Sequence, residues 1–182
     1  KEKGDAFELL VKNYLSYNPQ YATKLTSVWL LDEVPANIHR KLNLPTQDQG
    51  IDLICETKDG EYWAVQAKYH QDEQTTQTWR SLSTFTGLAF GVCKNISFGL
   101  VCTTAERFTK TLKNQDNIGF CTGEIWRNLE EDYFNIFEGK RKPKRLVPFK
   151  PYAHQKGAIK NAYKHFIKDG ESRGKLVLPC GT

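Results

Sequence analysis

The sequence predicts an α/β fold: a mixed β-sheet flanked by helices, with a helical and linker extension at the C-terminal end. The first observation is a set of short runs rich in β-branched and apolar residues, which have the length of strands: 51–56, 62–68, 96–103 and 118–121. The second is a set of helix-like segments, with apolar residues near a 3.6-residue period: 2–16, 77–90, 104–114 and 154–168. Strands that alternate with helices favour a sheet with helices on its faces.

The N-terminal region begins with the predicted helix 2–16. Asn18-Pro19 ends it, because proline lacks the amide hydrogen and restricts the residue before it. Residues 27–34 fit a strand or a short helix, and the pattern does not decide between them. Residues 36–49 read as a polar loop. The sheet is therefore predicted from residue 51 onward, with 27–34 as a candidate further strand.

A β-hairpin is predicted around Asp59-Gly60, because Asp-Gly between two β-rich runs is a turn signature. A two-residue turn would place Asp52 opposite Ala67, so Asp52 and Gln66 would lie on opposite faces of the sheet. A loop one residue longer, with Gly60 in the left-handed region, sets Asp52 across from Gln66. We predict the three-residue loop, since the site described below requires both side chains on one face.

The chain divides into three predicted parts. The segment 124–138 is aromatic and acidic and fits a helix, while the charged run Lys140–Arg145, with its proline, fits a linker. Beyond it, the helix 154–168 and a short strand at 175–178 belong to a new unit. The expected parts are a body at 1–138, a basic linker at 139–151 and the start of a second domain at 152–182.

Composition excludes several classes of protein. Hydrophobic residues make up 39% and charged residues 26% of the 182 residues, which is typical of a globular protein and not of a disordered one. No apolar run approaches the roughly 20 residues that a membrane-spanning helix needs, so we expect a cytoplasmic protein.

The five cysteines lie far apart, without a Cys-x-x-Cys pair, and are expected to be buried, reduced thiols. The absence of Met suggests a piece of a longer reading frame.

Charge is distributed unevenly along the chain. Residues 1–138 hold 14 Lys or Arg against 19 Asp or Glu, a net −5, whereas residues 139–182 hold 12 against 2, a net +10. A protein that held DNA only through general phosphate attraction would spread its basic residues over the body. The acidic body instead fits a site whose carboxylates hold a cation, with nucleic acid delivered by another part of the protein.

Two strand residues and a carboxylate predict a metal-dependent hydrolytic site. Gln66 and Lys68 are two residues apart on a strand, so they point to the same face. Phosphodiester hydrolysis needs a hard cation that polarises the phosphate and lowers the pKa of a water, and Mg²⁺ prefers oxygen ligands. Asp52 supplies a carboxylate, while the Gln66 amide and the Ala67 carbonyl supply neutral oxygens. Lys68 would orient the nucleophile and offset charge in the transition state.

Each of these residues also has an ordinary structural reading. An exposed Asp before a strand is usually a turn or cap residue, a strand Lys is usually solvated, and Glu8 fits the polar face of the first helix. The functional reading is favoured because of the order of the motifs. The order along the chain is the one that a single active site requires: a helix, Gly-Ile-Asp, the hairpin, Gln-Ala-Lys and a second helix.

Three motifs carry a family resemblance: Lys3-Gly4-Asp5-Ala6-Phe7-Glu8, Gly50-Ile51-Asp52 and Gln66-Ala67-Lys68. Together they resemble the Mrr-like branch of the PD-(D/E)XK nucleases, in which a Gln commonly replaces the second acidic residue. The resemblance spans residues 3–122 and implies a restriction-endonuclease-like core with Mg²⁺-dependent endonuclease activity on double-stranded DNA. The resemblance also implies two sets of site residues that both include Glu8. The catalytic residues are Asp52, Gln66, Lys68 and Glu8. The metal ligands are Asp52, Gln66, Ala67 and Glu8.

The C-terminal segment carries a second resemblance. Pro151–Gln155 with the helix after it resembles the Gln motif of superfamily 2 helicases, and Val177–Thr182 resembles the strand and opening of a Walker A loop. By that resemblance Gln155, Gly181 and Thr182 contact ATP in a longer protein, since such a loop cradles phosphates with backbone amides. The sequence stops before the Gly-Lys-Thr of this motif, so we expect no ATP binding or hydrolysis by these residues alone.

A nuclease joined directly to the start of a translocase resembles the type ISP group of single-polypeptide restriction-modification enzymes. The resemblance implies translocase, methyltransferase and target-recognition domains further along the polypeptide. It also implies cleavage without sequence specificity of the nuclease itself, and a basic linker that is either a spacer or a DNA contact. Two alternatives stay open: a Holliday-junction-type or modification-dependent nuclease of the same fold, and a non-catalytic DNA-binding or docking module.

Overall fold

The computed structural model describes residues 2–46, 50–72, 74–113, 115–142 and 151–175. The chain falls into two compact units, unit 1 at 1–146 and unit 2 at 147–182, and each is described by itself. Their boundary lies within the stretch expected to be a linker, 139–151. Among the described residues, none of the helices combines the length and the apolar character that crossing a membrane requires.

Unit 1 is built on a five-stranded mixed sheet, as predicted. Its strands, in sheet order, are β1 (Leu25–Leu30), β2 (Leu53–Thr57), β3 (Tyr62–Lys68), β5 (Ile96–Thr103) and β7 (Ile118–Cys121). The first three pair antiparallel, whereas β3, β5 and β7 pair parallel. Two short strands, β4 (Thr76–Gln77) and β6 (Arg107–Phe108), form a separate parallel pair. The end of β3 and the start of β2 therefore meet at the same end of the main sheet.

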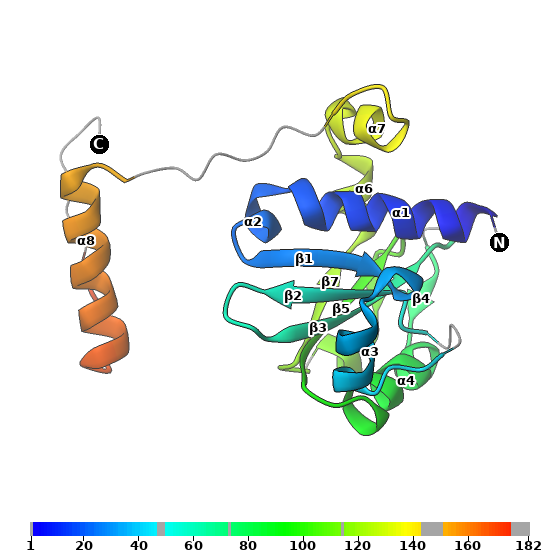
Figure 1. Cartoon of the computed structure of the whole chain (residues 1–182), viewed down its shortest axis with the longest axis horizontal. Helices are drawn as coiled ribbons and strands as arrows, with labels where there is room; N and C mark the ends of the chain where they lie inside the picture. Colours follow the sequence, from blue (N-terminus) through cyan, green and yellow to red (C-terminus); the bar gives the residue numbers. More distant parts are fainter. Residues whose placement is uncertain (1, 47–49, 73, 114, 143–150, 176–182) are drawn as a thin grey trace. The chain divides into compact units, whose positions relative to one another are not determined.

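Helices cover both faces of this sheet (Figure 1). On one face lie α1 (Glu2–Tyr17), α6 (Gly123–Arg127) and α7 (Glu131–Phe137). On the other face lie α3 (Ala36–Leu42) and α4 (Trp79–Gly87). The sheet is thus the middle of three layers, as the alternation of strands and helices predicted.

Alternation of side chains along the strands fills a core on each side of the sheet. Val11 and Leu15 of α1 are fully buried on the side of Val65. Phe85 of α4 is fully buried on the side of Ala64, the neighbouring residue of β3. Shorter elements complete unit 1: α2 (Pro19–Ala22), α5 (Lys110–Lys113), the 3-10 turn η1 (Leu31–Glu33) and the π-helical turn η2 (Leu88–Val92).

The β2–β3 hairpin has the predicted register. Leu53 pairs with Val65, and this pairing extended by one residue sets Asp52 opposite Gln66. Gly60 in the loop has φ +81°, the left-handed conformation that the three-residue loop requires. Because a Cβ disfavours that conformation, a glycine there selects the loop, and the loop decides which face Asp52 occupies.

The polar loop predicted over 36–49 is wrong for the part that the structure describes. Helix α3 occupies Ala36–Leu42 and ends at Asn43, which is left-handed with φ 51°. The apolar side chains of this helix pack on the core of the sheet: Leu42 is buried there, and Ile38, one turn earlier, is partly buried. Two apolar positions are too few to produce a visible period, so packing overrides the polar composition of the segment.

Other segments differ from the prediction in type or in boundaries. Residues 27–34 contain both alternatives in succession, because β1 runs directly into η1. The single helix predicted over 104–114 is wrong, since the segment contains the strand β6 and the four-residue α5. The helix predicted over 77–90 starts at Trp79, and the segment 124–138 forms two helices, α6 and α7.

Unit 2 contains one long helix within its described residues, α8 (Ala153–Tyr163), which a π-helical turn extends through Lys168. This agrees with the helix predicted over 154–168. Most of the strand predicted at 175–178 lies outside the described residues.

The cysteines behave as predicted where the structure describes them. Cys55, Cys102 and Cys121 are buried free thiols, and Cys93 is a partly buried one. Burial raises the pKa of the Cys55 thiol, so this sulfur stays protonated and unreactive. Cys180 lies outside the described residues.

Candidate active site

Asp52 lies immediately before β2, at the end of the sheet where β3 finishes. Its backbone is held on two sides: Asp52 N donates to Val65 O at 2.9 Å, and Leu31 N donates to Asp52 O at 2.9 Å. Its carboxylate is held as well, because Ala67 N donates to Asp52 Oδ2 at 2.6 Å. Asp52 is therefore oriented by protein contacts before any ligand binds.

Gln66 carries an unusual polar atom. Its side-chain oxygen, Oε1, is buried and has no hydrogen-bond partner among the described residues. Buried polar atoms are nearly always hydrogen-bonded or bound to an ion, since leaving them unpaired is costly. An unpaired amide oxygen across the hairpin from Asp52 is the kind of donor that a hard cation takes.

Gly50 permits the close approach of the chain to Gln66. Its φ is +107°, and a Cβ at this position would lie 3.2 Å from Gln66 Nε2. Both the conformation and the space therefore favour glycine. Gly50 belongs to the Gly-Ile-Asp motif, but no role for it was predicted from the sequence. A glycine close before a functional strand is the signal that could have found it.

Lys68 ends β3, and its ammonium group is anchored. Lys68 Nζ donates to Ser81 O, in the first turn of α4, at 2.8 Å. Burial lowers the pKa of Lys68, and the charge of Asp52 opposes that shift, so the two charges lie close enough to interact. Sequence reasoning missed Ser81, because a helix position does not reveal which backbone oxygen a distant lysine reaches.

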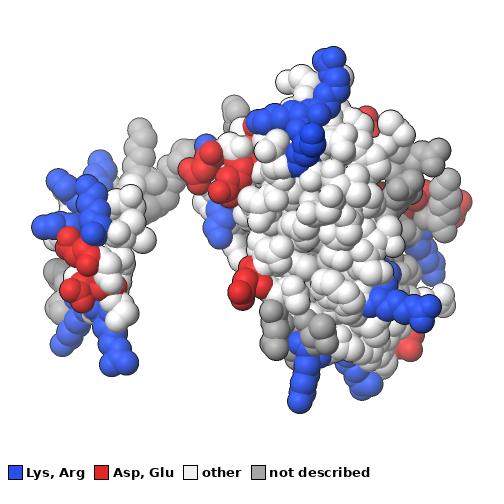
Figure 2. All heavy atoms as spheres, turned by 90° about the horizontal axis from the view of Figure 1, so that it is seen from below, with Lys and Arg blue, Asp and Glu red and all other residues white. Residues whose placement is uncertain are grey.

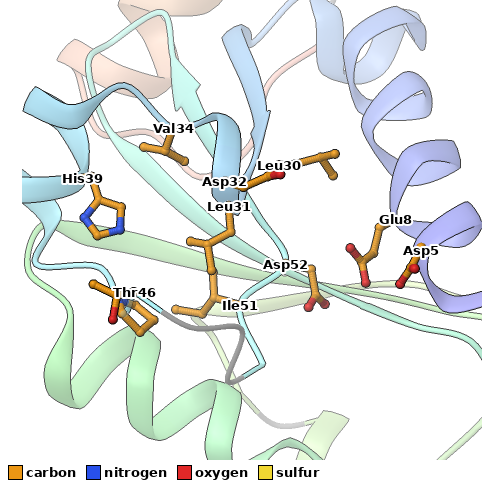
Figure 3. A pocket seen from close by; sticks show the side chains of 11 residues that line it. Asp5, Glu8, Leu30, Leu31, Asp32, Val34, His39, Thr46, Ile51 and Asp52 are labelled. Carbon is orange, nitrogen blue, oxygen red and sulfur yellow. The ribbon is translucent and has the colours of Figure 1, made fainter. Parts of the chain in front are cut away.

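A cavity of about 590 Å³ opens beside Asp52. In Figure 3 the carboxylate of Glu8 points from α1 toward Asp52, and Asp5 lies next to Glu8 on α1. Helix α1 thus brings a carboxylate from near the start of the chain to the end of the sheet. Asp5 adds a carboxylate that sequence reasoning did not assign to the site. The cavity is lined by Asp5, Glu8, Leu30, Leu31, Asp32, Val34, His39, Pro45, Thr46, Ile51 and Asp52.

The donors available to a cation are oxygens of different kinds. Within the described ranges, no three His, Cys, Asp or Glu side chains form a metal-binding group by themselves. A site here would combine the carboxylates of Asp52 and Glu8 with the Gln66 amide and the Ala67 carbonyl. An all-oxygen set suits Mg²⁺, whereas zinc sites usually contain thiolate or imidazole ligands.

The residues predicted to contact ATP belong to unit 2. Gln155 lies in the first turn of α8, where its Oε1 accepts a hydrogen bond from Tyr152 N at 3.0 Å. This is a helix-capping contact. Gly181 and Thr182 lie outside the described residues, so their contact with ATP stays a prediction.

Comparisons with known proteins bear on the family. Residues 16–132 match the model of a family described as restriction endonuclease, Mrr_cat_2. A search of curated proteins gives no match. Among solved structures, the ATP-dependent type ISP restriction-modification enzyme LlaBIII bound to DNA matches with a TM-score of 0.60 and 26% sequence identity. The match covers 97% of this chain and 11% of that enzyme, so the chain spans about a tenth of its relative.

Proposed function

Because the chain belongs to the restriction endonuclease family, we propose that it is a Mg²⁺-dependent endonuclease domain that hydrolyses phosphodiester bonds of double-stranded DNA. The family and the restriction-endonuclease-like fold expected from the motifs are confirmed. The observation that carries the proposal is the buried, unpaired Gln66 Oε1 across from the anchored carboxylate of Asp52. It supports a cation site at the end of the sheet where Lys68 also lies.

Four residues would hold the cation: Asp52, Gln66, Ala67 through its carbonyl, and Glu8 from α1. When bound, Mg²⁺ supplies Lewis acidity, since it polarises the phosphate and lowers the pKa of a water. Gln66 is neutral where an acidic residue would add charge, and Glu8 supplies the second negative charge instead. The amide of Ala67 keeps Asp52 oriented toward the same site.

Lys68 has a different role in the proposed reaction. An ammonium group has three donors, and one of them is engaged by Ser81 O. The other two are left to orient the attacking water and to stabilise the negative charge that develops on the phosphate. Because Gln66 and Lys68 share a face of β3, both groups act on the same side of the sheet.

We propose that DNA reaches this site by way of other parts of a longer polypeptide, and that unit 1 cuts without sequence specificity of its own. The net charge of −5 over residues 1–138 supports this. On the face of unit 1 drawn in Figure 2, one group of Lys and Arg side chains lies together at the upper edge, and the other Lys and Arg side chains stand apart on a surface that is mostly uncharged. LlaBIII is ATP-dependent and was solved bound to DNA, which also supports this proposal.

By this proposal an ATP-driven translocase begins in unit 2, where Gln155, Gly181 and Thr182 contact ATP once the remainder of that domain is present. Methyltransferase and target-recognition domains would follow the translocase. The basic stretch 139–151 would act as the spacer between nuclease and motor.

Cleavage of supercoiled plasmid by the intact protein, with Mg²⁺ and ATP, tests the site. Asp52→Ala and Lys68→Ala are expected to lower the cleavage rate by about 10²–10⁴-fold, the range for losing one group that acts in the transition state. Asp59→Ala, in the exposed hairpin loop, is the control and should cut at the wild-type rate. Chelation with EDTA should stop cleavage by every variant.

Two results would count against the proposal in different ways. If Asp52→Ala and Lys68→Ala cut as fast as the wild type, the assigned site is wrong. If the wild type binds DNA but does not cut it under any of these conditions, a non-catalytic docking module is favoured.

A further inference from the structure

We propose that Gln77 is a positioning residue that holds Lys68 in place for DNA cleavage, and that it acts through Ser81. The inference rests on the proposed nuclease function and extends it to residues outside the predicted motifs. Gln77 is not among the described residues that line the cavity beside Asp52. Its contacts are instead with the residues that surround Lys68.

Gln77 is a polar residue in the interior of unit 1. It lies in the two-residue strand β4, and its side chain is fully buried. Its amide has partners at both ends: Ser81 Oγ donates to Gln77 Oε1 at 2.8 Å, and Gln77 Nε2 donates to Thr103 Oγ1 at 3.2 Å. Gln77 Nε2 also contacts His70 Nε2. Since burying an unpaired amide is costly, these partners hold the amide in one orientation.

The three partners of Gln77 lie around Lys68. Thr103 is the residue of β5 that pairs with Lys68 of β3. His70 follows Lys68 by two residues, and burial, and then the charge of Lys68, lower the pKa of its ring. Ser81 provides the carbonyl oxygen that accepts from Lys68 Nζ at 2.8 Å. One buried amide therefore joins β5, α4 and the segment that follows β3 around one side chain.

Gln77 affects the position of Lys68 through its hydrogen bond with Ser81. A lysine carries its ammonium on a flexible four-carbon stem, so the position of the charge depends on a fixed acceptor. That acceptor lies in the first turn of α4, where Ser81 N also donates to Thr78 Oγ1 at 3.2 Å. Gln77 directly precedes Thr78, the N-cap of α4, and its side chain accepts a hydrogen bond from Ser81 Oγ. Gln77 is therefore connected to the first turn of α4 both through the backbone and through its side chain. A misplacement of about 1 Å at a reacting group can cost roughly 10²-fold in rate.

The first experiment measures the plasmid cleavage rate of the intact protein, with Mg²⁺ and ATP, together with its affinity for DNA. Ser81→Ala and Gln77→Leu are expected to lower the rate by up to about 10²-fold with little change in DNA affinity. Ser83→Ala is the matched control, because Ser83 is exposed on the same helix and donates to Arg80 O at 2.9 Å, away from Gln77. It should leave the rate unchanged.

The second experiment reads the position of Lys68 without cleavage. The intact protein is acetylated briefly, and the modification of each lysine is measured by peptide mass spectrometry. Lys68 should react more slowly than Lys58, which lies in the exposed hairpin loop. Ser81→Ala should raise the reaction rate of Lys68 and leave that of Lys58 unchanged, whereas Ser83→Ala should change neither. This measurement decides the question even if Gln77→Leu does not fold.

The outcomes separate this inference from the proposed function. If Lys68→Ala abolishes cleavage while Ser81→Ala and Gln77→Leu cut like the wild type, the inference is overturned and the nuclease assignment stands. If Ser81→Ala and Ser83→Ala change Lys68 acetylation equally, Gln77 and Ser81 do not position the lysine. If Lys68→Ala itself cuts normally, the proposed role of the site fails instead.

Discussion

Gly50 lies next to the side chain of Gln66, and there is little space between them. Gly50 has φ +107°, and a Cβ built there would lie 3.2 Å from Gln66 Nε2 and 3.7 Å from Phe85 N. A side chain at this position would push on the amide whose oxygen is the proposed ligand. The orientation of Gln66 thus depends on a residue that carries no functional group.

Gly50→Ala should lower both stability and cleavage. An alanine forced into the left-handed region costs about 1–2 kcal/mol in the free energy of unfolding, and the new methyl group displaces Gln66. Gly139→Ala is the matched control, because Gly139, which follows α7, has φ +70° and no atom within 4 Å of its Cβ position. Chemical denaturation should show similar losses for both variants, but only Gly50→Ala should lose cleavage activity. Equal cleavage by both variants would contradict the role given to Gln66.

At the scale of elements, helix α1 decides where Glu8 lies. Two aromatic side chains of α1 pack against Trp126 of α6: the ring centroids of Phe7 and Tyr14 each lie 5.1 Å from the ring centroid of Trp126. Trp126 is in turn tied to the sheet, since its Nε1 donates to Thr103 O at 3.0 Å. The helix is therefore fixed by aromatic packing on the sheet face opposite α4, and Glu8 is carried to the sheet end as a consequence.

Leu15→Ala tests this docking. Leu15 is fully buried and Leu9, on the same helix, is 37% exposed. Leu15→Ala should cost about 2–5 kcal/mol in the free energy of unfolding, because it leaves a cavity under the helix. Leu9→Ala should change stability by no more than about 0.5 kcal/mol. Urea denaturation measures both, and similar values for the two variants would show that α1 is not anchored through its buried face.

At the scale of the whole molecule, charge is distributed unevenly between the body and the C-terminal part of the chain. Residues 1–138 carry the candidate site and a net −5, whereas residues 139–182 carry a net +10. The local carboxylates suit a cation but repel a DNA backbone until that cation is bound. A nuclease of this kind gains from being presented with DNA, which fits the proposal that other parts of a longer chain supply it.

A fragment of residues 1–138, the range with the net charge of −5, should fold by itself but hold DNA weakly. It contains both cores of unit 1, and domains of this size usually unfold in one cooperative transition, which circular dichroism can follow during heating. Its affinity for duplex DNA, measured by fluorescence anisotropy at about 0.15 M salt, should be weaker than about 10⁻⁶ M, the tighter end of non-specific binding. The intact protein serves as the comparison. Sub-micromolar binding by the fragment would show that unit 1 captures DNA without help.

The strands and the hairpin register were predictable because their causes are local. Residues 96–103 and 118–121 are strands as predicted, and Gly60 selects the loop that places Asp52 opposite Gln66. Helix α3 was not predictable, since it is stabilised by two apolar side chains, Ile38 and Leu42, and their burial is recognisable only once the sheet against which they pack exists.

The sequence by itself determined the family, the order of the segments that carry Asp52, Gln66 and Lys68, and the face of β3 that Gln66 and Lys68 share. Those features follow from residue spacing and turn chemistry, which act over a few residues. Only the tertiary structure decided that Gly50 approaches Gln66, and that a buried Gln77 lies beside the partners of Lys68. Such contacts join separate elements, and no short-range pattern records which side chains meet when a helix packs on a sheet.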